Sequence, residues 1–133
     1  NPRKAARDLK SAVGLSPGSW PLRKVYAEAL MDAGEPAAAL STLEGLVGLR
    51  PDIAPAYSFM CDAAGKAGKR VESMRWRAEY LYRTGDLEPA IRQLELALRQ
   101  SDVAFHLASK MQVRLAELER EERSRKRRRS GGD

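Results

Sequence analysis

The chain is 133 residues long and 43% hydrophobic, and it carries a formal net charge of +6, one histidine and one cysteine. A chain of this length forms one domain or a piece of a larger protein, and the single Cys61 excludes an internal disulfide. No run approaches the roughly 20 apolar residues that a membrane-spanning helix needs, so we expect no transmembrane segment. Because the sequence opens on Asn1-Pro2 without methionine, we expect a fragment of a longer protein. Abundant alanine and leucine favour an all-α fold.

The spacing between Pro17 and Pro51 defines a repeat period that organises the first half of the chain. This period of about 34 residues, with small and large apolar residues recurring along it, is typical of a tetratricopeptide array, in which each repeat is a pair of helices. We therefore predict an orphan second repeat helix over residues 1–14, followed by a complete repeat over residues 19–49. Ser19 is the expected N-cap of the first helix of that repeat.

The next repeat is predicted over residues 53–84, but its second helix departs from the pattern. Read half a period out of phase, this helix becomes the first half of a following repeat, and residues 86–99 form the remaining half. At the corner between them, Gly85 is expected to take the left-handed conformation and Asp86 to cap the next helix with its side chain. The glycines expected at helix corners are Gly34, Gly68 and Gly85. The repeat register therefore shifts at the second helix of this repeat. In the helices before and after that shift, the residues expected to face inward are Tyr57, Met60, Cys61, Ala64, Leu87, Ala90, Ile91, Leu94, Ala97 and Leu98.

Residues 102–129 read as one long C-terminal helix that caps the array. Its apolar stripe is expected at Val103, Leu107, Met111, Leu115 and Leu118. Beyond the stripe, three acid–base pairs at i,i+4 spacing are expected to extend the helix into solvent: Glu119 with Arg123, Glu121 with Arg125, and Glu122 with Lys126. Residues 130–133 are expected to be a disordered tail. The predicted fold is thus an all-α, tetratricopeptide-like solenoid of about seven antiparallel helices, filling residues 1–129.

The sequence gives no sign of catalytic chemistry, and we predict no catalytic, cofactor-binding or metal-binding residue in it. A zinc site requires several histidine, cysteine or carboxylate ligands, but His106 and Cys61 stand alone, and both are expected to be packed structurally. The aromatic residues Trp20, Trp76, Tyr80 and Tyr82 are expected mainly in packing. Residues 120–129 hold seven bases and two acids, whereas residues 1–119 hold 17 bases and 15 acids. Nucleic acid is therefore an unlikely partner, because only the tail is basic.

The candidate site is the surface of the first helix of each repeat, which lines the groove of such arrays. A mixed polar surface with one apolar anchor fits a protein or an extended peptide segment better than a small molecule. The alternative is that these positions are merely solvated. The predicted protein-binding groove residues are Lys24, Glu28, Met31, Asp32, Ser58, Asp62 and Lys66.

The segment AEYLYRTGDLEPAIRQLELALRQ (residues 78–100), followed by the helix that ends RLAELEREER (residues 114–123), resembles a more specific family. It is similar to the C-terminal tetratricopeptide domain of bacterial HExxH zinc metallopeptidases of the β-barrel assembly-enhancing type. The resemblance implies a periplasmic protein whose repeats recruit substrate or the outer-membrane protein assembly machinery to its own protease domain in cis. Zinc would then be bound upstream of Asn1, because this chain lacks HExxH. The alternatives are a cytoplasmic scaffold unrelated to proteolysis and a nucleic-acid-associated module that uses the arginine tail.

Overall fold

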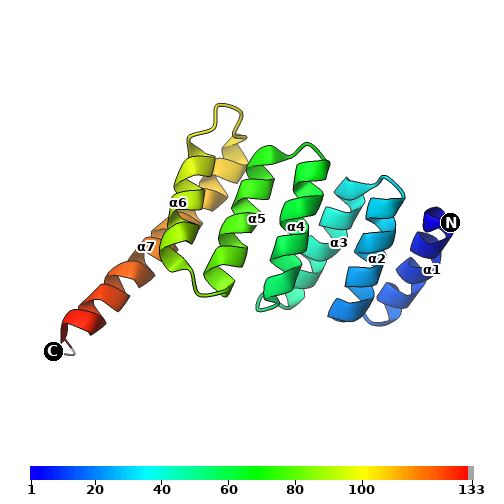
Figure 1. The fold of residues 1–133 in the computed structure, drawn as a ribbon, viewed down its shortest axis with the longest axis horizontal. Helices are drawn as coiled ribbons and strands as arrows, with labels where there is room; N and C mark the ends of the chain where they lie inside the picture. The colour runs from blue at the N-terminus through cyan, green and yellow to red at the C-terminus, as the bar shows by residue number, and fades with distance from the viewer. Residues whose placement is uncertain (132–133) are drawn as a thin grey trace.

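The computed structural model describes residues 1–131, and within that range the chain forms seven α-helices and no strand. Each helix runs antiparallel to the one before it, so the helices stand side by side in a row with the two termini at opposite ends (Figure 1). The helices are α1 (Pro2–Leu15), α2 (Trp20–Asp32), α3 (Pro36–Leu49), α4 (Ala54–Lys66), α5 (Arg70–Arg83), α6 (Leu87–Leu98) and α7 (Phe105–Gly131). The predicted all-α solenoid is confirmed.

The repeat period is built into the helix boundaries. Both ends of α3 lie one full period after the ends of α1, and both ends of α4 lie one full period after those of α2. Proline at the first or second helical position recurs in α1 to α4, where the missing N–H costs no helical hydrogen bond. Local backbone chemistry therefore sets where each of these helices starts.

Equivalent residues of the two repeats also secure the loops in front of them. The Nε of Arg23 on α2 donates to the carbonyl oxygen of Pro17 at 2.8 Å. One period later, the hydroxyl of Tyr57 on α4 donates to the carbonyl oxygen of Pro51 at 2.7 Å. Arg50 joins the two loops by donating to the carbonyl oxygen of Gly18 at 3.0 Å. These bonds hold neighbouring helix pairs at a fixed spacing along one edge of the row.

The α5–α6 corner is a tight left-handed turn. Gly85 has φ +94°, and the N–H of Asp86 donates to the carbonyl oxygen of Leu81 at 2.8 Å, which closes the end of α5. The predicted role of Asp86 is wrong, since its side chain makes no capping hydrogen bond to the described residues. The closed turn sets Asp86 at φ −98° and ψ 69°, whereas Ser19 is extended (ψ 111°) and does accept from the N–H of Leu22 at 3.2 Å.

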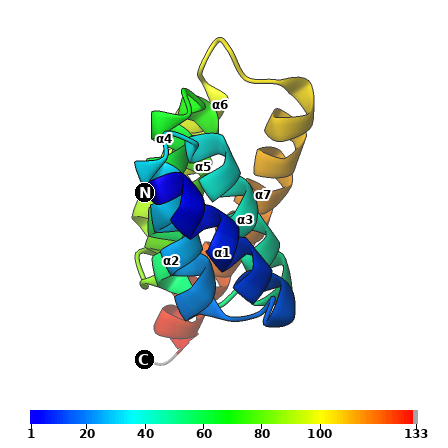
Figure 2. The same cartoon turned by 90° about the vertical axis from the view of Figure 1, so that its right-hand side faces the viewer.

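Two apolar clusters form the core, and α5 contributes to both of them. Trp76 of α5 belongs to the cluster that joins α1 to α4, whereas Val71 and Ala78 of the same helix belong to the cluster made with α6 and α7. Viewed along the row, α2 and α4 lie on one side, and α3 and α7 on the other (Figure 2). The division of α5 between the two clusters is what is expected if this helix ends one repeat and begins the next. The residues predicted to face inward at the shift are all buried except Cys61 and Leu98, which are partly exposed.

The C-terminal helix starts later and ends later than predicted. Asp102 lies in the turn before α7, where it pairs with Arg70 at 3.1 Å, and the helix begins only at Phe105. Ser130 and Gly131 are helical rather than disordered, while residues 132 and 133 lie outside the described part. Arg128 donates to the hydroxyl of Ser124 at 3.1 Å, one of the i,i+4 contacts that carry the helix to this point.

Charge pairs support α7 past its last buried residue, Leu118. Ion pairs form between Glu121 and Arg125 at 2.9 Å, and between Glu122 and Lys126 at 4.0 Å. The third predicted pair, Glu119 with Arg123, is not among the ion pairs of residues 1–131; Arg123 is exposed, whereas Glu119 is partly buried. None of the helices within residues 1–131 is long and apolar enough to cross a membrane.

Candidate protein-binding groove

A hollow of about 490 Å³ lies where α2, α4 and the C-terminal end of α5 come together. Residues spaced by one turn line the hollow from each helix: Trp20 and Lys24 from α2, Ser58 and Asp62 from α4, and Tyr80 from α5 together with Thr84, which directly follows that helix. This i,i+4 spacing places both members of a pair on the same helix face. The remaining lining residues are Ala54, Pro55 and Phe59. We refer to this hollow as the groove.

Three of the seven predicted site residues line the groove, and four do not. Lys24, Ser58 and Asp62 come together in it, although α2 and α4 are one full repeat apart in the sequence. The residues outside the groove are Glu28, Met31, Asp32 and Lys66. Glu28, Asp32 and Lys66 are exposed farther along their helices, whereas Met31 packs partly against the N-terminal core. Met31 is therefore not the free apolar anchor that the sequence suggested.

Aromatic side chains supply the apolar surface of the groove instead. Trp20, Phe59 and Tyr80 are each partly buried against the N-terminal core and partly open to the groove. Sequence reasoning assigned Trp20 and Tyr80 to packing and did not single out Phe59. The sequence contains one sign that Phe59 lies in the groove, because this residue directly follows the predicted groove residue Ser58. The sequence does not show that α5 closes the third side of the groove.

The charged residues of the groove are free to contact a ligand. Lys24 and Asp62 are exposed, and neither takes part in an ion pair within 4.0 Å among the described residues. They carry opposite charges on neighbouring helices, so the groove presents both signs around its aromatic residues. Such a surface matches a peptide, which has polar backbone groups and side chains of mixed character, better than it matches a polyanion.

A network of charged and aromatic side chains fixes the position of α5, the third wall of the groove. Glu79 of α5 accepts two hydrogen bonds from Arg114 of α7, at 2.5 and 3.2 Å, and lies 3.7 Å from Arg83. The guanidinium of Arg83 lies over the rings of Tyr57 and Tyr82, 5.6 and 5.5 Å from their centres. The ring of Trp76 stacks on that of Tyr57 at 5.9 Å. The network therefore ties α4, α5 and α7 together.

Burial and hydrogen bonding shift the pKa values of groups in this network. Burial raises the pKa of Tyr57. The pKa of Tyr82 is raised by the hydrogen bond that the Tyr82 hydroxyl donates to Glu121, and burial adds to that effect. For Arg114, burial opposes the charged form, but its hydrogen bonds and charge pairing with Glu79 outweigh burial and raise the pKa. Each of these groups keeps its neutral-pH charge state, so the network is a brace and not an acid–base site.

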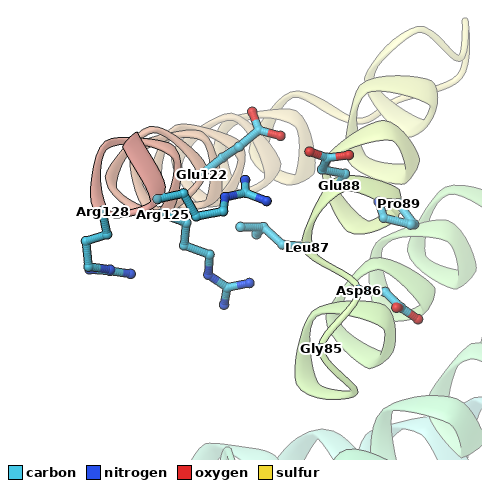
Figure 3. Close-up of a pocket in the computed structure, with 9 residues that line it drawn as sticks. Gly85, Asp86, Leu87, Glu88, Pro89, Glu122, Arg125 and Arg128 are labelled. Carbon is cyan, nitrogen blue, oxygen red and sulfur yellow. The ribbon is translucent and has the colours of Figure 1, made fainter. Parts of the chain in front are cut away.

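A second hollow, of about 620 Å³, lies between the α5–α6 corner and the basic end of α7. Figure 3 shows Arg125 and Arg128 of α7 on one side and the corner residues, with Asp86 and Glu88, on the other. Its six charged lining residues are three arginines and three acids, and Arg125 is already paired with Glu121 at 2.9 Å. The charged residues that line this hollow therefore carry no net formal charge.

The other side chains singled out in the sequence have structural surroundings. Cys61 is partly buried, and its Sγ lies 3.3 Å from the hydroxyl of Ser73. The expectation that His106 is packed is wrong: it is exposed, because the buried face of α7 passes through Leu107 and Met111 instead. The described residues contain no cluster of three potential metal ligands.

The fold and the groove together define an all-α, tetratricopeptide-like solenoid. The family model for the tetratricopeptide repeat matches residues 1–60, which include α1, α2, α3 and half of α4. A comparison with curated proteins finds no match. Residues 1–60 are thus similar to the tetratricopeptide repeat, a repeat that implies a module for protein–protein interaction and is typically non-catalytic.

Proposed function

We propose that the chain is a protein-binding module and that an extended segment of the partner lies in the groove between α2, α4 and α5. The observation that carries this proposal is the groove itself, in which Trp20, Phe59 and Tyr80 surround the exposed Lys24 and Asp62. Partly buried aromatic residues are good anchors, because they offer a large contact area and lose little side-chain entropy on binding. The two charges select the register and direction of the bound segment.

The rigidity of the groove favours this mode of binding. Its walls belong to helices that are packed into one cluster, and its third wall is braced by the pairing of Glu79 with Arg114. A preformed groove orders little of itself on binding, so more of the contact energy appears as affinity. A segment that binds there in extended form exposes both backbone and side chains to the aromatic and charged lining residues.

A display selection of random peptides against the 133-residue chain tests the proposal. Peptides that bind the groove should lose about tenfold or more in affinity, roughly 1.4 kcal/mol, when Lys24→Glu or Asp62→Lys reverses a groove charge. The matched controls are Lys66→Glu and Asp32→Lys, which make the same changes at exposed positions of the same two helices outside the groove. Equal affinity for groove and control variants places the binding surface elsewhere and refutes the proposal.

A narrower proposal concerns the protein to which this module belongs. We propose that it is the repeat domain of a periplasmic zinc metallopeptidase, recruiting substrate or the outer-membrane protein assembly machinery to a protease domain in cis. Its support is the resemblance of residues 78–100 described above. The alternative is a cytoplasmic scaffold unrelated to proteolysis. An HExxH motif and a signal peptide encoded upstream of Asn1 support the first proposal, and an upstream sequence without HExxH refutes it.

A further inference from the structure

Side chains of the groove hold hydrogen-bond donors that the protein itself leaves unused. They are the indole N–H of Trp20 on α2 and the hydroxyls of Ser58 on α4 and Tyr80 on α5, and none of these groups makes a hydrogen bond to another described residue. All of these side chains are half-buried. In the described chain, however, the buried side-chain atoms without a partner belong to Trp76 and Arg83 alone. The donors of the groove are therefore open to solvent and available to a ligand.

The free hydroxyl of Tyr80 is not shared by the tyrosines around it. The hydroxyl of Tyr57 donates to the carbonyl oxygen of Pro51 at 2.7 Å, and that of Tyr82 donates to Glu121 at 2.9 Å. The ring of Tyr80 packs against the N-terminal core, so its hydroxyl has a fixed place in the groove. The groove thus keeps a positioned donor where the neighbouring tyrosines use theirs within the fold.

The groove offers donors but no backbone edge. Its walls are helices, whose N–H and C=O groups are bonded along their own axes, so a ligand β-strand finds no row of acceptors for its N–H groups. A helical ligand uses its carbonyl oxygens internally and leaves the donors of the groove unpaired. A polyproline II segment meets both conditions, because its carbonyl oxygens are free and each proline lacks an N–H.

The aromatic and charged lining of the groove suits the same ligand. Trp20, Phe59 and Tyr80 come from three different helices, and no stacked ring pair forms among them in the described part of the chain. Grooves lined with aromatic residues are a recurring means of binding proline-rich segments. Because α4 stands between α2 and α5 (Figure 1), the exposed Lys24 marks the α2 side of the groove. An acidic residue of the ligand would be attracted to that side.

We propose that the groove binds a proline-rich segment of a partner protein in the polyproline II conformation, with an acidic residue at the end that lies on α2. Trp20, Ser58 and Tyr80 donate to its carbonyl oxygens, the aromatic rings pack against its prolines, and Lys24 pairs with its acid. This inference rests on the proposed function, because it names the chemistry of the segment that occupies the same groove. The preformed conformation of such a segment lowers the entropy lost on binding.

Fluorescence anisotropy with labelled synthetic peptides tests the class of ligand. The probe is a run of about six prolines, roughly two turns of polyproline II, with aspartate at one end and prepared in both sequence orders. The comparison peptides keep the length and the charge but replace the prolines by glycine and serine, or by helix-forming alanine and glutamine. The better proline peptide should bind the 133-residue chain about tenfold or more tightly than either comparison peptide. Equal or weaker binding overturns the inference.

Variants of the chain then place the proline peptide in the groove. Tyr80→Phe removes one donor and keeps the ring, so the affinity should fall about three- to tenfold. Tyr26→Phe is the matched control, because Tyr26 is also half-buried against the N-terminal core but lies outside the groove. Replacing the aspartate of the peptide by asparagine should weaken binding to the parent chain but not to Lys24→Ala. Equal losses in both tyrosine variants, or an asparagine effect that persists in Lys24→Ala, contradict the assigned contacts.

These outcomes separate the inference from the proposed function. If the proline peptide does not bind at up to about 1 mM, while peptides from the display selection still respond to Lys24→Glu, only the class of ligand is wrong. If the selected peptides are also insensitive to that charge reversal, both proposals fail. Unchanged circular dichroism spectra show that each variant is folded, so a lost affinity reports on the groove.

Discussion

Replacing Gly85 by alanine isolates the backbone requirement of the corner that joins α5 to α6. Gly85 adopts φ +94°, a left-handed conformation, and the turn is closed by the bond from the N–H of Asp86 to Leu81. No neighbouring atom lies within 4 Å of the position that an added Cβ would take. The substitution therefore introduces no clash, and its effect on the free energy of unfolding comes from the backbone alone.

The expected magnitude follows from two opposing effects. Holding an L-residue in the left-handed conformation costs about 1–2 kcal/mol. Alanine also restricts the unfolded chain more than glycine does, and this lower entropy of the unfolded state offsets roughly 0.4–1 kcal/mol of that cost. The net loss of stability for Gly85→Ala is then about 1 kcal/mol, which lowers the melting temperature of a chain of this length by about 3–5 °C.

Gly48→Ala is the matched control, because Gly48 lies inside α3 and likewise has no atom within 4 Å of the added Cβ. There the alanine favours the helix, so we expect stabilisation by about 0.5–1 kcal/mol. Urea unfolding followed by far-UV circular dichroism, with thermal melts, measures both variants. The two changes must have opposite signs. If Gly85→Ala is as stable as the parent, the corner does not require a left-handed residue and the reasoning fails.

Two further predictions concern the brace between α5 and α7. Arg114→Ala leaves the carboxylate of Glu79, whose side chain is only 12% exposed, without its hydrogen-bond donor. The free energy of unfolding, measured with urea, should therefore fall by about 1–2 kcal/mol. A fall of less than a few tenths of a kcal/mol contradicts the bracing role. Since the folded pKa of Tyr82 is raised above the unfolded value near 10, its contribution is complete below pH 10 and is lost as the pH rises through the folded pKa. Stability measured from about pH 9 to 11 should therefore fall less steeply in Tyr82→Phe than in the parent, and equal slopes would contradict this assignment.

Much of the fold could be predicted because its signals are local. The first four helix starts are set by proline in the first turn, and the corners by glycine at φ +76° to +94°, both of which are readable in the sequence. Ser19 caps α2 as predicted, with the bond to Leu22 at 3.2 Å. Local chemistry did not suffice at Asp86, where closing the preceding turn fixed the backbone in a conformation unsuited to side-chain capping.

The candidate site was predicted less well, because it depends on three helices at once. Lys24, Ser58 and Asp62 were found from repeat position alone, since equivalent positions on α2 and α4 face the same way. Met31 occupies a similar surface position in the sequence pattern, yet the core covers part of it. The contribution of Tyr80 required knowing that the end of α5 closes the groove, which depends on the angle between helix pairs and not on any helical period.

The sequence by itself determined the repeat: helix lengths, corners and the inward-facing stripe follow from backbone preferences and from the spacing of apolar residues. Tertiary structure decided which residues of α5 pack in each of the two apolar clusters, with Trp76 in one and Val71 and Ala78 in the other. It also decided which polar positions on α2 and α4 meet aromatic side chains. The physical reason is that helical periodicity says which residues share a face, while only packing between helices says what that face meets.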